Sequence, residues 1–283
     1  MGNNARKYVD LLHKATGGKH ANWDPPKLVE VGDWGYVDQK TAAFVKEGNI
    51  FTDPECSDAL ENLDKRVLYS SPEDVIRFDA NAVSTGGGNI SAGLGATGDV
   101  GIKVDVAWTF SPKNRGAVIT ASDVSTAYLE TGIIFPRLDK IKKLKDKAVV
   151  VETLTCPAYA LLLTDKGRGG SASVTLETWV SGAGVSVGPG IGGRWKAESQ
   201  TGVWRTAYGY RTDERAAKDV VFTPLFKLRT TNRRLRWPAA PIYRGAITHQ
   251  YEEYELPWKA LDEDGEEEDV VDDVTDSPVS ALY

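Results

Sequence analysis

The first fifteen residues carry apolar positions at the spacing of an amphipathic helix. Asn3 or Asn4 can cap a helix that runs to about Ala15 and stops at the glycines that follow. Residues three and four apart share a face of a helix, so one face is apolar and the other is charged. The apolar face consists of Ala5, Tyr8, Val9, Leu11, Leu12 and Ala15, and the polar face of Arg6, Lys7, Asp10, His13 and Lys14. Such a helix ordinarily packs against a sheet, but a basic polar face also suits an anionic bilayer, and both alternatives stay open.

Between residues 81 and 110 the apolar period changes to two, which is typical of strands with two unlike faces. The apolar positions are Ile90, Ala92, Leu94, Ala96, Val100, Ile102, Val104, Val106, Trp108 and Phe110. A second alternating tract contains Val174 and Leu176, and the glycine-rich stretch after it contains Val185 and Val187. The glycines of residues 93–98 fit a dinucleotide-binding motif, but that motif must open a helix, and here a strand pattern follows. We therefore reject it.

The other elements have weaker patterns. Short strands are predicted at residues 27–31 and 49–51, and the aromatic stretch between them forms either a hairpin or a structured loop. The further expected elements are a helix at 137–146, buried strands at 148–155 and 158–164, a strand at 203–210, and helix and loop at 211–258.

Charge is divided unevenly along the chain. From Glu252 to Tyr283 there are thirteen acidic residues and one Lys, which gives −12, whereas residues 1–251 carry 27 acidic and 33 basic residues, which gives +6. The acidic tail cannot bury enough apolar area to fold alone, and it either aids solubility or covers a basic surface of the same chain.

Basic residues gather in three places. They are Arg6, Lys7 and Lys14; Lys140, Lys142, Lys143, Lys145 and Lys147; and Arg229, Arg233, Arg234 and Arg236. An anionic membrane or a nucleic acid could each bind such clusters. Because no nucleic-acid-binding signature accompanies them, we predict no nucleic-acid partner.

Catalytic and metal-binding signatures are missing from the sequence. There is no nucleophile elbow, P-loop or zinc-protease motif, and Cys56 and Cys156 do not have the spacing of metal ligands. We expect no enzyme activity, no metal and no cofactor. The charged start of the chain and its short apolar runs predict a cytoplasmic protein.

The alternating strands have the length that a membrane requires. A β-strand crosses a bilayer with about 9 to 11 residues, apolar on one face and polar on the other. Residues 99–110 have this length and pattern. An ordinary half-buried antiparallel sheet has the same pattern, so the pattern alone leaves both alternatives open.

The order of these features resembles the pore-forming domain of the gasdermin family, and most of all the short fungal gasdermin-like proteins of allorecognition cell death. The resemblance covers roughly residues 3–228. It is carried by the basic amphipathic helix, by Val31-Gly-Asp-Trp-Gly-Tyr-Val through Gly48-Asn-Ile50, by the Ser- and Gly-rich strands of residues 83–110, by Lys147-Ala-Val-Val-Val-Glu-Thr-Leu-Thr155, and by the glycine-rich hairpin before Gly202-Val-Trp-Arg-Thr-Ala-Tyr208.

The resemblance implies an α+β fold: a twisted antiparallel β-sheet with a leading amphipathic helix and flanking helices. The expected division is a pore-forming domain at residues 1–228, a helix and loop segment at 229–258 and an acidic tail at 259–283. The implied function is to bind acidic lipids, oligomerise and extend two hairpins, at about residues 81–120 and 159–196, into a membrane-spanning β-barrel that kills the cell.

The site residues follow from the same resemblance. Lipid contacts are assigned to Arg6, Lys7, Lys14, Lys142, Lys143, Lys145 and Lys147, and membrane anchors to Trp34 and Phe44. The membrane-inserting positions are Ile90, Leu94, Val100, Ile102, Val104, Val106, Trp108, Phe110, Val174, Leu176, Val185 and Val187.

The implied partners are anionic phospholipids, further copies of the chain or an allelic partner, and an activating protease. The protein would then lie in the cytoplasm when inactive and at the plasma membrane when active. Animal members carry a large C-terminal repressor domain, whereas only about fifty residues follow Leu228 here. Control must therefore come from the short tail, from its proteolysis or from a partner protein. The alternative function is a soluble module that binds anionic lipid or nucleic acid without forming pores.

Overall fold

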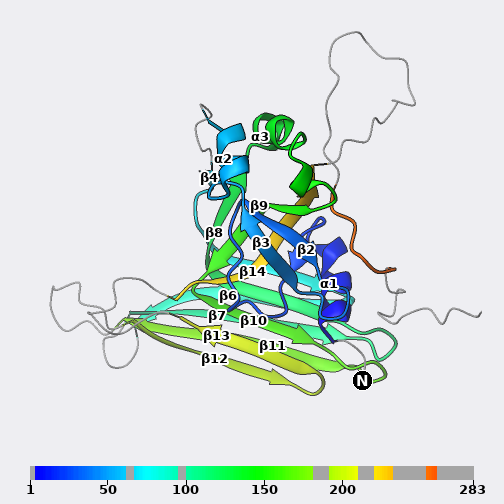
Figure 1. Ribbon diagram of the computed structural model, residues 1–283. Coiled ribbons are helices and arrows are strands. Elements are labelled where there is room, and N and C mark those ends of the chain that lie inside the picture. Colours follow the sequence, from blue (N-terminus) through cyan, green and yellow to red (C-terminus); the bar gives the residue numbers. More distant parts are fainter. Residues whose placement is uncertain are drawn as a thin grey trace, which may run out of the picture.

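The computed structural model describes residues 4–61, 67–94, 100–180, 191–209, 220–231 and 253–259. Helices α1 (Asn4–Ala15), α2 (Pro54–Ala59) and α3 (Thr131–Leu138) and the 3-10 turn η1 (Lys142–Leu144) accompany two antiparallel sheets (Figure 1). This arrangement confirms the expected α+β class. The strands are β1 (His20–Ala21), β2 (Asp33–Val37), β3 (Phe44–Asn49), β4 (Val67–Tyr69), β5 (Glu73–Ala80), β6 (Ala82–Leu94), β7 (Val100–Phe110), β8 (Ala117–Leu129), β9 (Ala148–Cys156), β10 (Ala158–Leu163), β11 (Gly170–Val180), β12 (Ile191–Ser199), β13 (Val203–Tyr208) and β14 (Phe222–Thr230).

The smaller sheet continues part of the larger one. In the larger sheet β8 lies between β5 and β10, and β10 also pairs with β13. In the smaller sheet β7 lies between β6 and β11, and β11 also pairs with β12. The chain leads directly from β5 into β6, from β7 into β8, from β10 into β11 and from β12 into β13. We name β5, β8, β10 and β13 the proximal half, and β6, β7, β11 and β12 the distal half.

The two halves meet along a line of four short segments, which we name the crease. Asn81 joins β5 to β6, residues 111–116 join β7 to β8, residues 164–169 join β10 to β11, and residues 200–202 join β12 to β13. Asn81 has a φ of 60°, a conformation that asparagine tolerates better than most residues. The glycines at 167 and 202 also have positive φ, so three of the four segments turn sharply.

The distal half folds back against one face of the proximal half. A shared apolar cluster joins side chains from both, and its members are Val106, Trp108, Phe110, Val118, Ala158, Ala160, Leu162, Ala172, Val174 and Leu176. The rings of Trp108 and Trp204, one from each half, have centroids 6.3 Å apart. All ten cluster residues are buried, so each half excludes water from the other.

Helix α1 covers the opposite face of the proximal half. Its Tyr8 and Leu12 belong to a second cluster with Ile119 of β8 and Leu161 of β10. With one face under α1 and the other under the distal half, every residue of β10 is buried, which explains its unbroken apolar sequence. Of the two alternatives for this helix, the structure shows packing against a sheet.

The strands predicted at residues 27–31 and 49–51 are wrong. The aromatic stretch between them instead forms the β2–β3 hairpin, which was one of the two alternatives for it. Residues 28–30 have no regular structure and lead into a turn at Gly32, whose φ of 88° suits glycine. The strand predicted before Gly32 therefore lies after it, as β2.

The helix predicted at residues 137–146 is also wrong. The helical segment is α3, which ends at Leu138, and η1 follows after the extended residue Ile141. The predicted apolar side is nevertheless buried, since Leu138, Ile141 and Leu144 are all in the core. Spacing identified the buried residues but not the backbone that presents them.

Strand β14 lies where helix and loop were predicted. It pairs with β1 on one side and β9 on the other, and both its faces are covered, so its sequence does not alternate. Pro224 lies at a register irregularity between Phe222 and Leu225. The strand also runs past residue 228, so the expected domain boundary cuts through it, and residues 253–259 return to pack against the same body.

Candidate functional site: the covered helix and the folded sheet

Residues 253–259, which we name the tail segment, lie against α1. Trp258 is only 8% exposed, and its indole Nε1 donates a hydrogen bond of 2.7 Å to the carboxylate of Asp10. The guanidinium of Arg6 lies 5.2 Å from the Trp258 ring centroid. A cation over a tryptophan face contributes about 0.5–1 kcal/mol at an exposed site and more when desolvated. Arg6, a predicted lipid contact, is therefore partly covered by the tail segment.

The other end of the tail segment is held by β14. The carboxylate of Glu253 forms an ion pair of 3.0 Å with Lys227, and Glu253 also forms an isolated β-bridge with Arg229. The backbone N–H of Tyr254 donates to the carbonyl of Leu228 at 3.3 Å. The beginning of the acidic tail thus covers basic residues of the same chain.

A cleft of about 670 Å³ lies where α1, the tail segment and the crease meet. Its walls include Asp10 and Lys14 of α1, Glu253 and Leu256 of the tail segment, and Asn81 of the crease. Three regions far apart in the sequence therefore adjoin each other at this place.

The predicted lipid-binding residues fall into two groups. Lys14 is exposed on α1 and Lys7 is half-buried there, whereas Lys142 and Lys145 are exposed beside α3. In Figure 1, α3 lies at the top of the view and α1 at the lower right. The structure therefore does not bring these residues together into one basic patch.

Two of the predicted lipid contacts already have acidic partners. Lys143 forms ion pairs with Asp53, the N-cap residue of α2, and with Glu55, and the hydrogen bond from Lys143 lowers the pKa of the Asp53 carboxyl. Lys147 forms an ion pair of 2.7 Å with Glu47 of β3. Both lysines connect neighbouring elements, so they are less available to a lipid than Lys142 and Lys145.

The predicted membrane anchors are buried in this conformation. Trp34 is 8% exposed and belongs to the cluster beneath α3, and Phe44 is 4% exposed and lies 5.8 Å from Phe226 by ring centroids. An anchor must reach the lipid, which neither side chain can do from these positions. Their role as membrane anchors stays a prediction, and it would require the β2–β3 hairpin to release both side chains.

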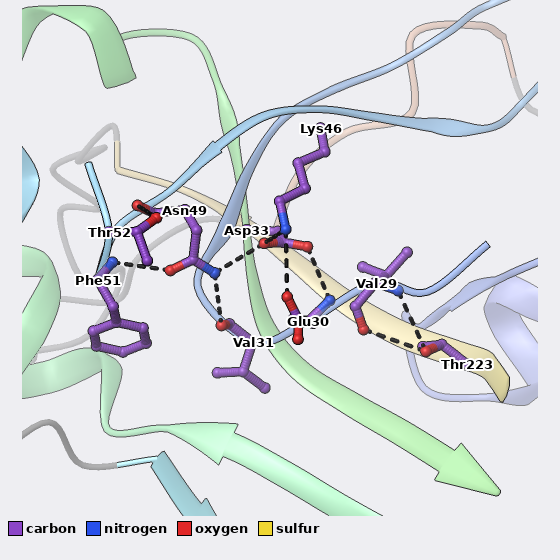
Figure 2. Close-up of polar contacts among 9 residues, drawn as sticks. All are labelled: Val29, Glu30, Val31, Asp33, Lys46, Asn49, Phe51, Thr52 and Thr223. Carbon is purple, nitrogen blue, oxygen red and sulfur yellow. Dashed lines mark hydrogen bonds and ion pairs between the residues drawn. The ribbon is translucent and has the colours of Figure 1, made fainter. Parts of the chain in front are cut away.

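Figure 2 shows what the motif around this hairpin does. The carboxylate of Asp33, 1% exposed, forms an ion pair of 2.7 Å with Lys46 and accepts hydrogen bonds from the Asn49 amide and the Glu30 backbone N–H. Because every one of these partners belongs to the hairpin or its entry turn, the network fixes the turn at Gly32. Part of the motif behind the family resemblance therefore has a structural role.

The predicted membrane-inserting side chains include five whose surroundings the structure describes. Val106, Trp108, Phe110, Val174 and Leu176 are all between 1% and 5% exposed, in the layer between the two halves. The alternate positions of these strands, which include Ala107, Thr109 and Ser171, are exposed. Alternation therefore predicted correctly which face is apolar.

The other predicted inserting positions are less fully described. Ile90 and Leu94 lie in β6, and Val100, Ile102 and Val104 lie in β7, with pairing that confirms two long strands. The surroundings of these five side chains lie outside the described part of the structure, as do Val185 and Val187 altogether.

The crease contains polar contacts that the sequence analysis missed. The Asn81 amide donates to the Arg115 carbonyl at 2.9 Å, and the Arg115 guanidinium donates to the Thr164 carbonyl at 3.0 Å. The backbone N–H of Asp165 donates to the Thr201 hydroxyl at 3.2 Å. Each crease segment is thus bonded to the next. The signal in the sequence was the turn-forming residues that interrupt each alternating tract.

Burial shifts the pKa values of one histidine and two cysteines in the core. Burial lowers the pKa of His20 to about 4, and its Nε2 donates to the Ala42 carbonyl at 2.9 Å. Burial raises the pKa of the Cys56 and Cys156 thiols to about 12. Within the described residues, no three His, Cys, Asp or Glu side chains gather as metal ligands. Among the described helices, none has the length and apolar character to cross a membrane.

No family model and no curated protein sequence matches the chain.

Proposed function

We propose that this protein is a gasdermin-like pore-forming protein that binds acidic membrane lipids, oligomerises with copies of itself or an allelic partner, and permeabilises the plasma membrane in regulated cell death. The observation that carries the proposal is the distal half, a four-stranded antiparallel sheet folded back so that its apolar face is buried. Strands β7 and β11 each have 11 residues, and about 9 to 11 residues cross a bilayer.

Lipid can replace the proximal half as the apolar partner of the distal half at a reasonable cost in free energy. Val106, Trp108, Phe110, Val174 and Leu176 leave water when they pack against the proximal half, and each such burial contributes about 1.5–3 kcal/mol. A bilayer interior is as apolar as a protein core, so lipid can replace the proximal half as the partner of these side chains. Water cannot replace the proximal half in this way, so the distal half stays folded back in solution.

The tail segment supplies the restraint in this proposal. It lies over Arg6 and beside Lys14, so it competes with lipid phosphates for the basic face of α1. A protease that cuts between β14 and residue 253, or a partner that displaces the tail segment, would uncover that face.

The experiment is dye release from liposomes with and without phosphatidylserine, with full-length protein and protein ending at Thr231. The proposal expects release from anionic vesicles only, faster for the shortened protein. Folding of both proteins in solution is checked by circular dichroism. Two folded proteins that bind anionic vesicles and release no dye would contradict pore formation.

That last outcome is the behaviour of the second candidate, a module that binds anionic lipid without forming pores. Lys142 and Lys145, exposed beside α3 and far from the folded sheet, favour it, because they could hold a membrane surface with every strand in place. Sedimentation with anionic vesicles without leakage distinguishes this module from a pore former.

A further inference from the structure

The two inner strands of the folded sheet keep the same register on both sides of the crease. In the proximal half, the last pair between β8 and β10 is Ala117 with Leu163. In the distal half, the first pair between β7 and β11 is Phe110 with Gly170. Between these pairs lie residues 111–116 on one chain and 164–169 on the other, which are six residues each. The inner crease segments therefore match in length.

The outer crease segments differ in length from the inner segments that they face. Asn81 alone faces residues 111–116 across the first crossing, since Ala80 pairs with Ala117 and Ala82 with Phe110. Three residues, 200–202, face the longer segment between Leu163 and Ala172 across the last crossing. If the sheet straightened, these outer strands would have to slip or keep a bulge, whereas the inner pair would not.

We propose that the sheet opens through this inner pair: residues 111–116 pair with residues 164–169 in the register already present, so that β7–β8 and β10–β11 become one continuous antiparallel ladder. This proposal rests on the proposed pore-forming function and names the step by which the distal half swings away. In that register Arg115 lies opposite Asp165, an opposite-charge pair of the kind that stabilises antiparallel strands. Pro112 has no N–H, so the ladder lacks one bond at that position.

One end of the new ladder is already paired. The Thr164 backbone N–H donates to the Gly116 carbonyl at 2.9 Å, which continues the β8–β10 register by one residue. At the other end, the Gly167 backbone N–H donates to the Pro112 carbonyl at 3.1 Å, one residue out of that register, so this bond must break for Gly167 to face Lys113. At the Thr164–Gly116 end, side chains take the place of the return backbone bond: the Gly116 N–H donates to the Thr164 hydroxyl at 2.6 Å, and the Arg115 guanidinium donates to the Thr164 carbonyl. Closing the ladder exchanges these side-chain contacts for backbone pairs.

The test is an insertion experiment. One glycine is inserted after Lys113, one after Lys166, or one at each place, in protein that ends at Thr231. Both sites are exposed segments of the crease, where the folded-back conformation tolerates an added residue. A single insertion makes the two inner crease segments unequal in length. The extra residue must then form a bulge, or it must shift the strand by one position, which turns the apolar side chains of that strand to the opposite face of the sheet. The matched double insertion restores equal lengths.

We expect each single insertion to slow dye release from anionic vesicles about tenfold, and the double insertion to restore it to within about twofold of the unmodified protein. A glycine inserted after Ser71, which is exposed between β4 and β5, is the matched control and should leave release unchanged. Circular dichroism and melting temperature establish that all variants keep the soluble fold.

The outcomes separate the two proposals. If the unmodified protein and the single-insertion variants release dye at the same rate, the continuous ladder is contradicted and pore formation is not, because the crease segments then remain unpaired loops in the pore. A folded double insertion that remains as slow as the single ones would overturn it as well. Absence of release by the unmodified protein would overturn the proposed function, and the ladder with it.

Discussion

In the proximal half, β10 directs Tyr159, Leu161 and Leu163 toward α1 and Ala160 and Leu162 toward the distal half, and all of these residues are buried. In the distal half, β11 buries its alternate apolar residues and leaves small polar ones on its other face. The proximal half is therefore covered on two apolar faces, whereas the distal half is covered on one. Because lipid can replace a single contact, we expect the distal half, and not the proximal half, to keep its own apolar face out of water after it leaves the body.

The largest effect is expected from the same substitution placed in each half. Leu161→Asp puts a charge between α1 and the sheet and should unfold the protein, since an unpaired buried charge costs about 4 kcal/mol or more. Val174→Asp should abolish dye release while β9 and β14 stay protected in hydrogen exchange. Ser171→Asp, on the exposed face of β11, is the matched control and should retain both fold and release. Equal loss of protection in the Leu161 and Val174 variants would remove the distinction between the halves.

Acid should weaken the body before it affects the distal strands. His20, in β1 beside β14, has a pKa of about 4 in the fold because burial disfavours its charge, whereas an unfolded histidine titrates near 6.5. Between these values the unfolded chain binds more protons, so stability is lost as the pH falls from about 6.5 to about 4, by up to about 3 kcal/mol. His20→Gln, which keeps a donor for the Ala42 carbonyl, should remove this component from urea unfolding curves measured at pH 7 and pH 4.5. An unchanged pH dependence in the variant would assign it to other groups.

The tail segment should act on the start of opening and not on the strands themselves. Trp258→Ala removes the hydrogen bond to Asp10 and the ring beneath Arg6, and should accelerate release from anionic vesicles about tenfold at low salt, which corresponds to about 1.4 kcal/mol. Trp258→Phe, which keeps a ring without the N–H, should be intermediate. The difference should shrink as salt rises, because ionic strength screens both the tail and the lipid contacts. Identical rates for all three proteins at low salt would show that the tail segment does not restrain opening.

The smallest effects concern the basic residues. Lys14→Glu on α1 and Lys142→Glu with Lys145→Glu beside α3 should each weaken sedimentation with phosphatidylserine vesicles by about 1 kcal/mol per charge removed. Lys40→Glu, in the exposed turn of the β2–β3 hairpin, is the control. If only the α3 pair weakened binding, the membrane would approach from the end of the molecule opposite to that expected for α1. Equal binding of all variants to neutral and anionic vesicles would contradict electrostatic recognition.

The sequence predicted the strands that alternate and missed the features that depend on distant neighbours. Alternation placed Val106, Trp108 and Val174 on one face, because a strand with one covered face must alternate. It could not show that this face lies on the proximal half, since the fold at the crease is set by turns far apart in the chain. Strand β14 was missed because both its faces are covered and its pattern therefore has no period.

The candidate site was predicted only in part. Arg6 and Lys14 lie on the basic face of α1 as expected, but composition gave no sign that Trp258, within an acidic stretch, would pack on that face. Trp34 was assigned to the membrane from the family resemblance, and the pattern around it did not show that it is buried. Its burial depends on the turn at Gly32 and on the glycine at 48, where a side chain would collide with the Trp34 ring.

Fluorescence along β11 measures directly whether the distal half enters the bilayer. Single cysteines at positions 171 to 176 carry an environment-sensitive dye, and the native Cys56 and Cys156 are buried thiols with a raised pKa, so they label slowly. Quenchers attached to lipid acyl chains are then added in anionic vesicles. We expect quenching at 172, 174 and 176 and not at 171, 173 and 175, with the same alternation that burial shows in solution. Lipid quenching at none of these positions, while the folded protein is bound to vesicles and releases dye, would contradict the claim that the distal half inserts.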